Sequence, residues 1–278
     1  ERQLGRGGFG SVFYGTDKKT GASVAIKQMK ITKRNRVEYM LVETELHAKS
    51  SAHPNIVTYL DSFFLEAKSE FWVVLEYIDG CTLEGLLGLE KFKEPQMAHV
   101  TKCVCNALTY IHHMQRMHRD IKLGNVLIGP NASVKLTDFG LAAQLTQQRE
   151  QRSTMCGTPD LVAPEIVRRS KYGVEVDVWA LGMLVLKMCL CSPLIHIRDP
   201  VKVLQYIDTN GPPRLTKKKY SDQMKNFVER SVLMNPEERW TTAQLLKHEW
   251  LNKASTNGFD SMLKVIRQRD GPGGCVIQ

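Results

Sequence analysis

The chain has 278 residues, 42% of them hydrophobic, and 38 lysines and arginines against 29 aspartates and glutamates give it a net charge of +9. This length allows one large hydrophobic core or two packed lobes without covalent staples. The seven cysteines have neither the spacing of a zinc site nor that of a secreted disulfide framework, so we expect reduced thiols in a cytosolic or nuclear protein, most simply a cytoplasmic one. No apolar run approaches the roughly 20 residues that cross a bilayer, and the lysine runs lack interleaved aromatics. We therefore expect no transmembrane segment and no nucleic-acid partner.

The first part of the chain is predicted to be a small sheet with one helix. β-branched and aromatic residues predict four strands, at residues 11–14, 23–27, 58–64 and 71–77. Between the second and third strands, residues 37–48 place Met40, Glu43 and Leu46 or His47 on one helical face. A polar loop that ends in Thr20-Gly21 makes the first two strands a hairpin.

From about residue 83 the hydrophobic period becomes helical. It is clearest at Val100, Val104, Leu108 and Ile111, and the run 176–188 is apolar on nearly every side, as in a buried central helix. The pattern predicts an α+β fold of two lobes, a small antiparallel β-sheet lobe with one main helix and a larger, mainly α-helical lobe. We expect these lobes at residues 1–78 and 79–263, with a hinge near residues 76–80 and a flexible glycine-rich tail at 264–278.

A glycine motif opens the chain, where residues 4–12 read L-G-R-G-G-F-G-S-V. Glycines allow backbone amides to approach phosphates closely, and Val12 offers an apolar surface to a base. A strand follows, and not the helix that a dinucleotide fingerprint requires, which excludes that class of site.

Lys27 ends an otherwise apolar strand, where an unpaired ammonium is costly to bury. It therefore needs an acidic partner and an anionic ligand. The predicted helix offers Glu43 or Glu45, and Glu43 is favoured because it shares its face with Met40.

The stretch His118 to Asn125 and the later Asp138-Phe139-Gly140 hold the most informative polar residues. An aspartate such as Asp120 can take or orient a hydroxyl proton, and Lys122 can neutralise a moving phosphoryl group. Asn125 and Asp138 supply the oxygen ligands that Mg²⁺ prefers. In this order the motifs indicate phosphoryl transfer.

Together these motifs resemble those of eukaryotic protein kinases, from Leu4 to about Leu251. Three further elements carry the resemblance: Ala163-Pro164-Glu165, Asp177-Val178-Trp179, and Arg239 at the position where the family pairs an arginine with the Ala-Pro-Glu glutamate. Lys122 and Gly157-Thr158-Pro159 are similar to serine/threonine kinases, which implies Ser/Thr protein substrates.

Within that family the chain is most similar to PAK-like kinases, the sterile-twenty-type group that small GTPases switch on. The similarity lies in residues 25–29, 59–62, 72–77 and 152–155, while residues 122–125 and 174–177 also resemble polo-type kinases. The chain begins inside a motif and not at a methionine, so we expect upstream sequence through which a small GTPase acts.

The resemblance implies ATP and Mg²⁺ as cofactors. It makes Asp120 the catalytic base, Lys27 the phosphate clamp paired with Glu43, and Asn125 and Asp138 the metal ligands, with Lys122 beside the reacting groups. Leu75 becomes the gatekeeper, and the backbone of Glu76 and Ile78 bonds adenine. The implied nucleotide site comprises Leu4, Gly5, Arg6, Gly7, Gly8, Phe9, Gly10, Ser11, Val12, Ala25, Lys27, Leu75, Glu76, Ile78 and Leu127.

In kinases of this type a phosphorylated activation-loop residue pairs the arginine beside the catalytic aspartate. Here the arginine is Arg119 and the acceptor is Thr154, with Ser153 as the competing site. A phosphate brings about two negative charges and three acceptor oxygens, enough to order a loop onto that arginine.

The chain departs from the PAK-like pattern on the side where substrate binds. It has Asp160-Leu161-Val162 in place of bulky aromatics, and Lys187 where many arginine-directed kinases have a glutamate. Gly124 stands where some have another acid. We expect a weaker preference for basic residues upstream of the target hydroxyl; alternatively, Lys187 simply faces solvent.

The last four residues, Cys275-Val-Ile-Gln, match a farnesylation pattern, so a prenyl anchor at Cys275 and association with a membrane are open alternatives. Three other functions remain open. They are a pseudokinase, a small-molecule or lipid kinase, and a GTPase-binding module in upstream sequence.

Overall fold

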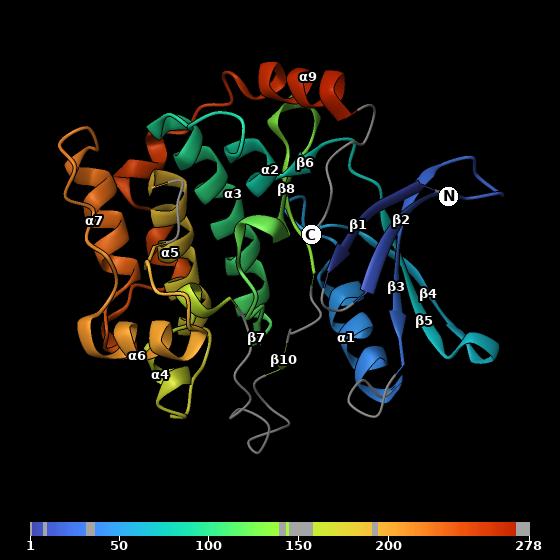
Figure 1. Cartoon of the computed structure of the whole chain (residues 1–278), viewed down its shortest axis with the longest axis horizontal. Helices are drawn as coiled ribbons and strands as arrows, with labels where there is room; N and C mark the ends of the chain where they lie inside the picture. The colour runs from blue at the N-terminus through green and yellow to red at the C-terminus, as the bar shows by residue number, and fades with distance from the viewer. Residues whose placement is uncertain are drawn as a thin grey trace. The chain divides into compact units, whose positions relative to one another are not determined.

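The computed structural model describes residues 2–7, 10–31, 37–138, 143–144, 158–190 and 194–270 (Figure 1). Within these ranges it leaves out the side chains of residues 37–39, 42, 43, 46, 143, 144, 269 and 270. Contacts divide the chain into two units. The first comprises residues 1–89, 124–140 and 258–278, and the second residues 90–123 and 141–257.

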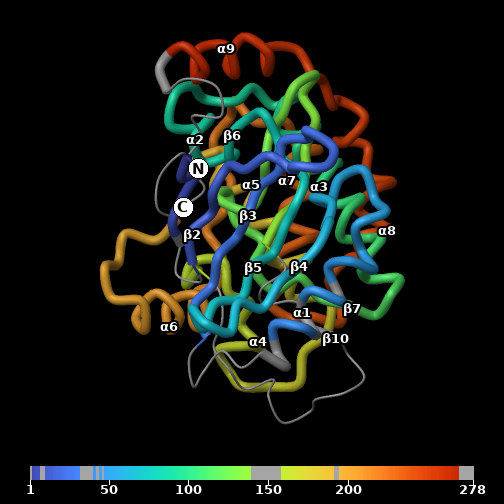
Figure 2. The backbone as a smooth tube through the Cα atoms, turned by 90° about the vertical axis from the view of Figure 1, so that its right-hand side faces the viewer, coloured from blue at the N-terminus to red at the C-terminus, as the bar shows by residue number. Residues whose placement is uncertain are grey.

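The first unit contains a five-stranded antiparallel sheet of order β1-β2-β3-β5-β4. Its strands are β1 (Arg2–Gly7), β2 (Gly10–Thr16), β3 (Ser23–Lys30), β4 (Tyr59–Leu65) and β5 (Glu70–Glu76). In β5 the buried residues alternate, so that Phe71, Val73 and Leu75 face one side. Helix α1 (Val37–Ser50) packs against β4 and β5 on that side, and Met40 joins the core there (Figure 2).

A second, three-stranded sheet of order β6-β8-β9 completes the first unit. Its strands are β6 (Cys81–Thr82), β8 (Val126–Ile128) and β9 (Val134–Leu136). Helix α2 (Leu83–Leu87) begins directly after β6, and the Thr82 hydroxyl caps it by accepting the Gly85 amide at 3.1 Å. Helix α9 (Phe259–Asp270) packs against α2 and the short 3-10 helix η3 (Pro130–Ala132).

The second unit is mainly helical. Its helices are α3 (Glu94–His113), α4 (Pro164–Val167), α5 (Glu175–Leu190), α6 (Pro200–Asn210), α7 (Asp222–Ser231) and α8 (Thr242–Leu245), with a short strand pair β7 (Arg116–Met117) and β10 (Ala143–Gln144). The described part of the chain also has short 3-10 helices in both units: η1 (Glu66–Lys68), η2 (Leu123–Asn125), η4 (Pro159–Leu161), η5 (Pro236–Glu238) and η6 (Glu249–Lys253). Helix α5 is buried on nearly every side, as its all-round apolar sequence predicts.

The expected α+β architecture is confirmed, since the four predicted strands overlap β2 to β5 and the predicted helix lies within α1. Strand β1 was not predicted because its glycines have low strand propensity. One expectation needs correction: residues 264–270, placed in a flexible tail, are helical in α9, where buried Phe259, Met262 and Ile266 hold the helix against the first unit. Among the described residues, no helix combines the length and apolar composition that a bilayer crossing needs.

Candidate active site

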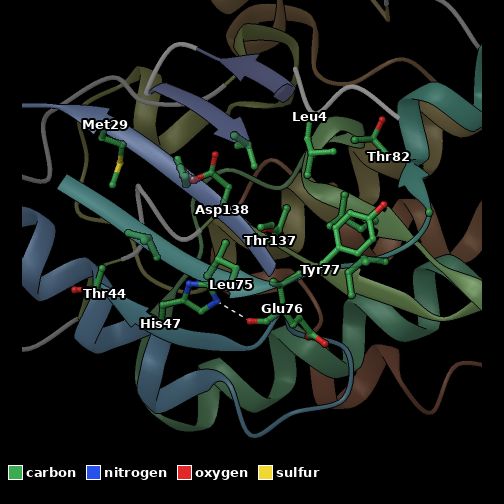
Figure 3. A pocket seen from close by; sticks show the side chains of 18 of the residues that line it. Leu4, Met29, Thr44, His47, Leu75, Glu76, Tyr77, Thr82, Thr137 and Asp138 are labelled. Carbon is green, nitrogen blue, oxygen red and sulfur yellow. Dashed lines mark hydrogen bonds and ion pairs between the residues drawn. The ribbon is translucent and has the colours of Figure 1, made fainter. Parts of the chain in front are cut away.

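A pocket in the first unit collects most of the predicted nucleotide-site side chains (Figure 3). The predicted residues that line it are Leu4, Val12, Ala25, Lys27, Leu75, Glu76, Ile78, Leu127 and Asp138. The apolar members belong to one hydrophobic core cluster, to which β1, β2, β3, β5 and β8 contribute. The pocket therefore offers apolar walls that suit a flat aromatic base and a charged group beyond them.

The chain from Glu76 to Thr82, here called the 76–82 segment, forms one side of the pocket, and all its residues except Asp79 line it. The Glu76 carboxylate is bound by Lys135 Nζ at 2.5 Å, by the Thr58 amide at 2.7 Å and by the Thr58 hydroxyl at 2.9 Å. These bonds fix the side chain of Glu76 against the sheet and the β8–β9 hairpin. The Glu76 carboxylate is thus engaged by protein groups.

The charged end of the pocket is an ion pair between Lys27 Nζ and Asp138 Oδ1 at 2.6 Å, with both side chains largely buried. Asp138 has a φ of 66°, a left-handed conformation that is uncommon for a residue other than glycine. Such strain is often retained at functional positions.

Asn125 lies at the same end of the β8–β9 hairpin as Asp138. Strand β8 pairs with β9 through Val126 and Leu136, and the next bond joins the Thr137 amide to the Asn125 carbonyl at 2.9 Å. Thus the hairpin carries the two predicted metal ligands on adjacent strand ends. One carboxylate and one amide oxygen suit Mg²⁺, which takes its remaining ligands from phosphates and water. Among the described residues no larger cluster of histidine, cysteine and carboxylate groups could hold a metal by itself.

The expected partnership of Lys27 with Glu43 falls outside the described side chains. The alternative, Glu45, is exposed and forms an ion pair with Lys49 one turn further along α1. Among the described side chains, Asp138 forms an ion pair with Lys27.

Helix α1 instead contributes Met40, Thr44 and His47 to the pocket. Thr44 and His47 lie at the end opposite Tyr77 and Thr82 (Figure 3). The Thr44 hydroxyl donates to the Met40 carbonyl at 3.0 Å. His47 Nε2 lies 2.7 Å from the Val57 carbonyl, which can only accept, so this nitrogen carries the proton. Thr44 was not predicted as a pocket residue, although its spacing of four from Met40 and three from His47 places all three on one helical face.

The glycine motif is described only in part. Gly5, Arg6 and Gly7 belong to β1 and Gly10 and Ser11 to β2, where Gly7 pairs with Gly10; these residues do not line the described pocket, and Gly8 and Phe9 lie outside the described residues. Gly10 has a φ of 150°, and a Cβ there would lie 2.1 Å from the Gln28 carbonyl oxygen. Glycine is therefore required at this position by close backbone approach.

Asp120 lies in the second unit, where it is buried and lines a small pocket. Lys122 Nζ contacts Asp120 Oδ2 at 2.8 Å, so the two predicted catalytic residues lie side by side. The other residues that line this pocket are Arg119, Ile121, Thr158, Leu161, Val162, Ala163, Ile166, Val176 and Ala180.

Fully buried Asp177, at the start of α5, holds the backbone that carries Asp120. One carboxylate oxygen accepts the Arg119 amide at 2.8 Å, and the other accepts the His118 amide at 2.8 Å and His112 Nε2 at 2.9 Å. Burial alone raises the pKa of Asp177, but the hydrogen bond from His112, the charges of His112 and His118, and the Arg119 amide hold that pKa below its ordinary 3.8. Arg119 takes a φ of 66°, so these bonds stabilise a strained loop.

Two further ion pairs fix the chain that follows Thr158. Arg239 binds both carboxylate oxygens of Glu165, at 2.5 and 2.8 Å, and both side chains are buried, which confirms the pairing expected from the resemblance. Lys187 binds Asp160 at 3.0 Å, with only 18% and 15% of their side chains exposed. The alternative in which Lys187 simply faces solvent is therefore wrong.

Three predicted sites lie outside the described residues: Thr154, its competitor Ser153, and Cys275. The predicted phosphorylation and prenylation at these residues therefore stay predictions.

The family model for the protein kinase domain matches residues 1–251. The chain belongs to the protein kinase family. Among curated kinases it is 39% identical over 253 residues to serine/threonine-protein kinase PAK 1 of Mus musculus, covering 91% of this chain and 46% of that protein. It is 38% identical over 271 residues to serine/threonine-protein kinase pakC of Dictyostelium discoideum, covering 95% of this chain and 56% of that protein.

A third relative is serine/threonine-protein kinase PAK mbt of Drosophila melanogaster, 36% identical over 253 residues, or 91% of this chain and 39% of that protein. The chain thus spans about half the length of the curated kinases it matches. The similarity to PAK kinases that the sequence motifs indicated is confirmed.

Proposed function

We propose that this chain is an active serine/threonine kinase domain that transfers the γ-phosphate of Mg-ATP to hydroxyls of protein substrates. The observation that carries the proposal is the pocket of the first unit, whose apolar walls end at the Lys27–Asp138 pair. An adenine fits between Leu4, Ala25 and Leu127, and the charged pair suits phosphates and a metal.

Lys27 binds the phosphates in this proposal, and Asn125 and Asp138 hold Mg²⁺. The metal, when bound, neutralises charge on the phosphate oxygens. The Glu76 carbonyl and the Ile78 amide bond adenine, since the Glu76 carboxylate is occupied by Thr58 and Lys135. Leu75 stands as gatekeeper at the point where the pocket continues toward Thr44 and His47.

Asp120 is proposed to accept the proton of the substrate hydroxyl. Its carboxylate is buried and contacts Lys122, a cation that can also bind the transferring phosphoryl group. Thr158 lines the same small pocket, so we assign this pocket to the acceptor serine or threonine.

Phosphate transfer from ATP to a serine/threonine peptide library tests the proposal, with wild type compared with Asp120→Asn, Lys27→Met and Asp138→Ala. We expect Asp120→Asn to lower kcat by about 10²–10⁴-fold while ATP still binds. Asp208→Ala, which removes an exposed ion pair with Arg168, is the control and should keep full activity. If wild type binds ATP but transfers no phosphate, the chain is a pseudokinase and the proposal is wrong. Transfer to lipids or small molecules but not to peptides would equally contradict it.

Phosphorylation of Thr154 is proposed to activate the kinase by pairing with Arg119, beside the catalytic aspartate. Protein made in a host without kinases, then phosphorylated or left unmodified, tests this. Full activity of Thr154→Ala in both states would contradict it, and an effect confined to Ser153→Ala would move the site to the neighbouring residue.

The Lys187–Asp160 pair bears on substrate choice. Asp160 lies in the turn between Thr158 and Leu161, which both line the Asp120 pocket, and its carboxylate is neutralised by Lys187. We propose that this side of the site offers no free carboxylate to a substrate arginine, and that acceptor peptides are selected without a strong basic preference.

A small GTPase is proposed as regulator from the resemblance to PAK-like kinases, which the 36–39% identity to PAK 1 and PAK mbt supports. A cytoplasmic location is proposed on the same basis. A prenyl anchor at Cys275 remains a proposal that rests on the four-residue pattern alone, and metabolic labelling of the full-length protein with and without Cys275→Ser tests it.

A further inference from the structure

Helix α9 begins beyond residue 251, where the match to the kinase family model ends. It nonetheless belongs to the first unit and packs against other elements of that unit. Phe259, Met262, Leu263 and Ile266, at positions i, i+3, i+4 and i+7 of one helical face, are each no more than 6% exposed. This apolar stripe packs against α2 and η3 (Figure 1).

Both elements under α9 continue directly into the nucleotide pocket. Helix α2 starts after Thr82, the last residue of the 76–82 segment, and η3 follows the strand that carries Leu127. Thr82 and Leu127 are themselves neighbours in the β6–β8 ladder. The helix therefore lies against the outer side of two pocket walls.

The 76–82 segment and β8 touch through their backbones. A Cβ at Gly80 would lie 1.9 Å from the Ile128 carbonyl oxygen, so the two chains approach as closely as glycine allows. The Gly80 amide also donates to the Ile78 carbonyl at 2.9 Å, which closes a tight turn around Asp79. Displacement of Asp79 would therefore move Ile78 and Gly80, both of which line the pocket.

Arg267 of α9 binds Asp79 twice. Its Nη2 donates to the Asp79 carboxylate at 2.8 Å and to the Asp79 carbonyl at 3.1 Å. The two side chains are 41% and 46% exposed, so the ion pair is worth little as a source of overall stability. The ion pair instead fixes the position of the Asp79 carbonyl in the turn. Arg267 can do this because α9 is itself held in place by buried side chains.

We propose that α9 braces the 76–82 segment and that Arg267 is a positioning residue for ATP, acting through Asp79. This inference rests on the proposed kinase function. The ion pair holds the turn in its binding geometry before ATP binds. Less conformational entropy is then lost on binding, so the Kd for ATP is lower.

A double-mutant cycle tests the brace, with Arg267→Ala, Asp79→Ala and the double variant in the 278-residue chain. ATP affinity is measured by direct binding without acceptor, and KM and kcat for ATP by peptide phosphorylation. We expect each single variant to raise the Kd and KM for ATP about two- to fivefold with kcat unchanged, the range of an exposed charge pair. The double variant should be no weaker than the worse single one, and high salt should shrink the difference from wild type.

Lys264→Ala removes an exposed charge from the same helix and should leave the Kd for ATP unchanged. Arg267→Lys, which keeps the charge, should recover part of the affinity. A merely structural role for Arg267 predicts a lower Tm with an unchanged Kd, and that result, or effects that multiply in the double variant, would overturn the proposal. Failure of wild type to bind ATP would instead overturn the kinase function and this inference with it.

Discussion

Replacement of Asp177 by asparagine should separate the role of its charge from that of its shape. Each carboxylate oxygen accepts a backbone amide, from Arg119 and from His118, both at 2.8 Å. Asparagine has one oxygen, so its NH₂ group must face one of these donors. The variant loses one charge-assisted hydrogen bond, worth about 1.5–3 kcal/mol, and leaves a buried amide unsatisfied, which costs about 1–3 kcal/mol. We therefore expect a destabilisation of at least about 3 kcal/mol.

For a chain of this size that loss lowers Tm by about 6–12 °C, measured by calorimetry. Since Arg119 and Asp120 are adjacent, we also expect kcat to fall while the KM for ATP stays the same. Asp208→Asn, in an exposed pair, is the matched control with no change expected. A Tm of Asp177→Asn within 2 °C of wild type would refute the reasoning.

The stability difference between wild type and Asp177→Asn should also depend on pH. The pKa of Asp177 is lower in the folded than in the unfolded chain, where it is near 3.8. Its contribution is therefore fully present above about pH 3.8 and is lost as pH falls through the folded-state pKa. Denaturation at several pH values should show the two proteins converging only at the acid end.

Three further variants follow from contacts in the structure. Arg239→Ala leaves the Glu165 carboxylate buried without its bidentate partner and should cost about 3–5 kcal/mol in urea denaturation. Gly80→Ala places a methyl group 1.9 Å from the Ile128 carbonyl oxygen, so it should cost about 1–3 kcal/mol and raise the Kd for ATP in a binding assay. Lys187→Glu puts a second carboxylate beside Asp160 and should turn a peptide-library profile without arginine dominance into one that favours upstream arginine.

The first two variants have matched controls in the chain. Arg168→Ala breaks an exposed pair and should cost less than about 1 kcal/mol, so an equal loss for Arg239→Ala would contradict the burial argument. For Gly80→Ala the control is Gly88→Ala, whose added Cβ lies 3.4 Å or more from the nearest carbonyl oxygens and should leave ATP affinity unchanged. A Gly80→Ala variant that binds ATP normally would contradict the argument from close approach in the 76–82 segment. Arginine dominance in the wild-type peptide profile would overturn the substrate argument.

The sequence predicted the elements whose signals are local. Alternation identified β5, and an all-round apolar run identified α5. One long-range contact was also predicted, the Arg239–Glu165 pair across 74 residues, because two separate motifs of the family resemblance specify it.

Contacts that depend on helix rotation or on distant chain segments were harder to predict. Helix α1 places Thr44 in the pocket and leaves Glu45 paired with Lys49 on the surface. These neighbouring residues face opposite ways, and helix propensity does not predict the rotation of the helix that decides this. The end of α9 was not predicted. The glycine-rich residues at the end of the chain led to a predicted flexible tail that began at residue 264, inside the helix. The buried stripe that orders this helix gains its stability from α2 and η3, which lie far away in sequence.

The pair between Lys27 and Asp138 has a consequence for how charge is balanced through a catalytic cycle. The ammonium of Lys27 is a counter-ion of the Asp138 carboxylate, at 2.6 Å in a largely buried place. If Asp138 held a metal and Lys27 held the phosphates, as proposed, each side chain would exchange its present partner for one of opposite charge. The two largely buried charges are thus matched by opposite charges both in the ion pair and in the proposed complex.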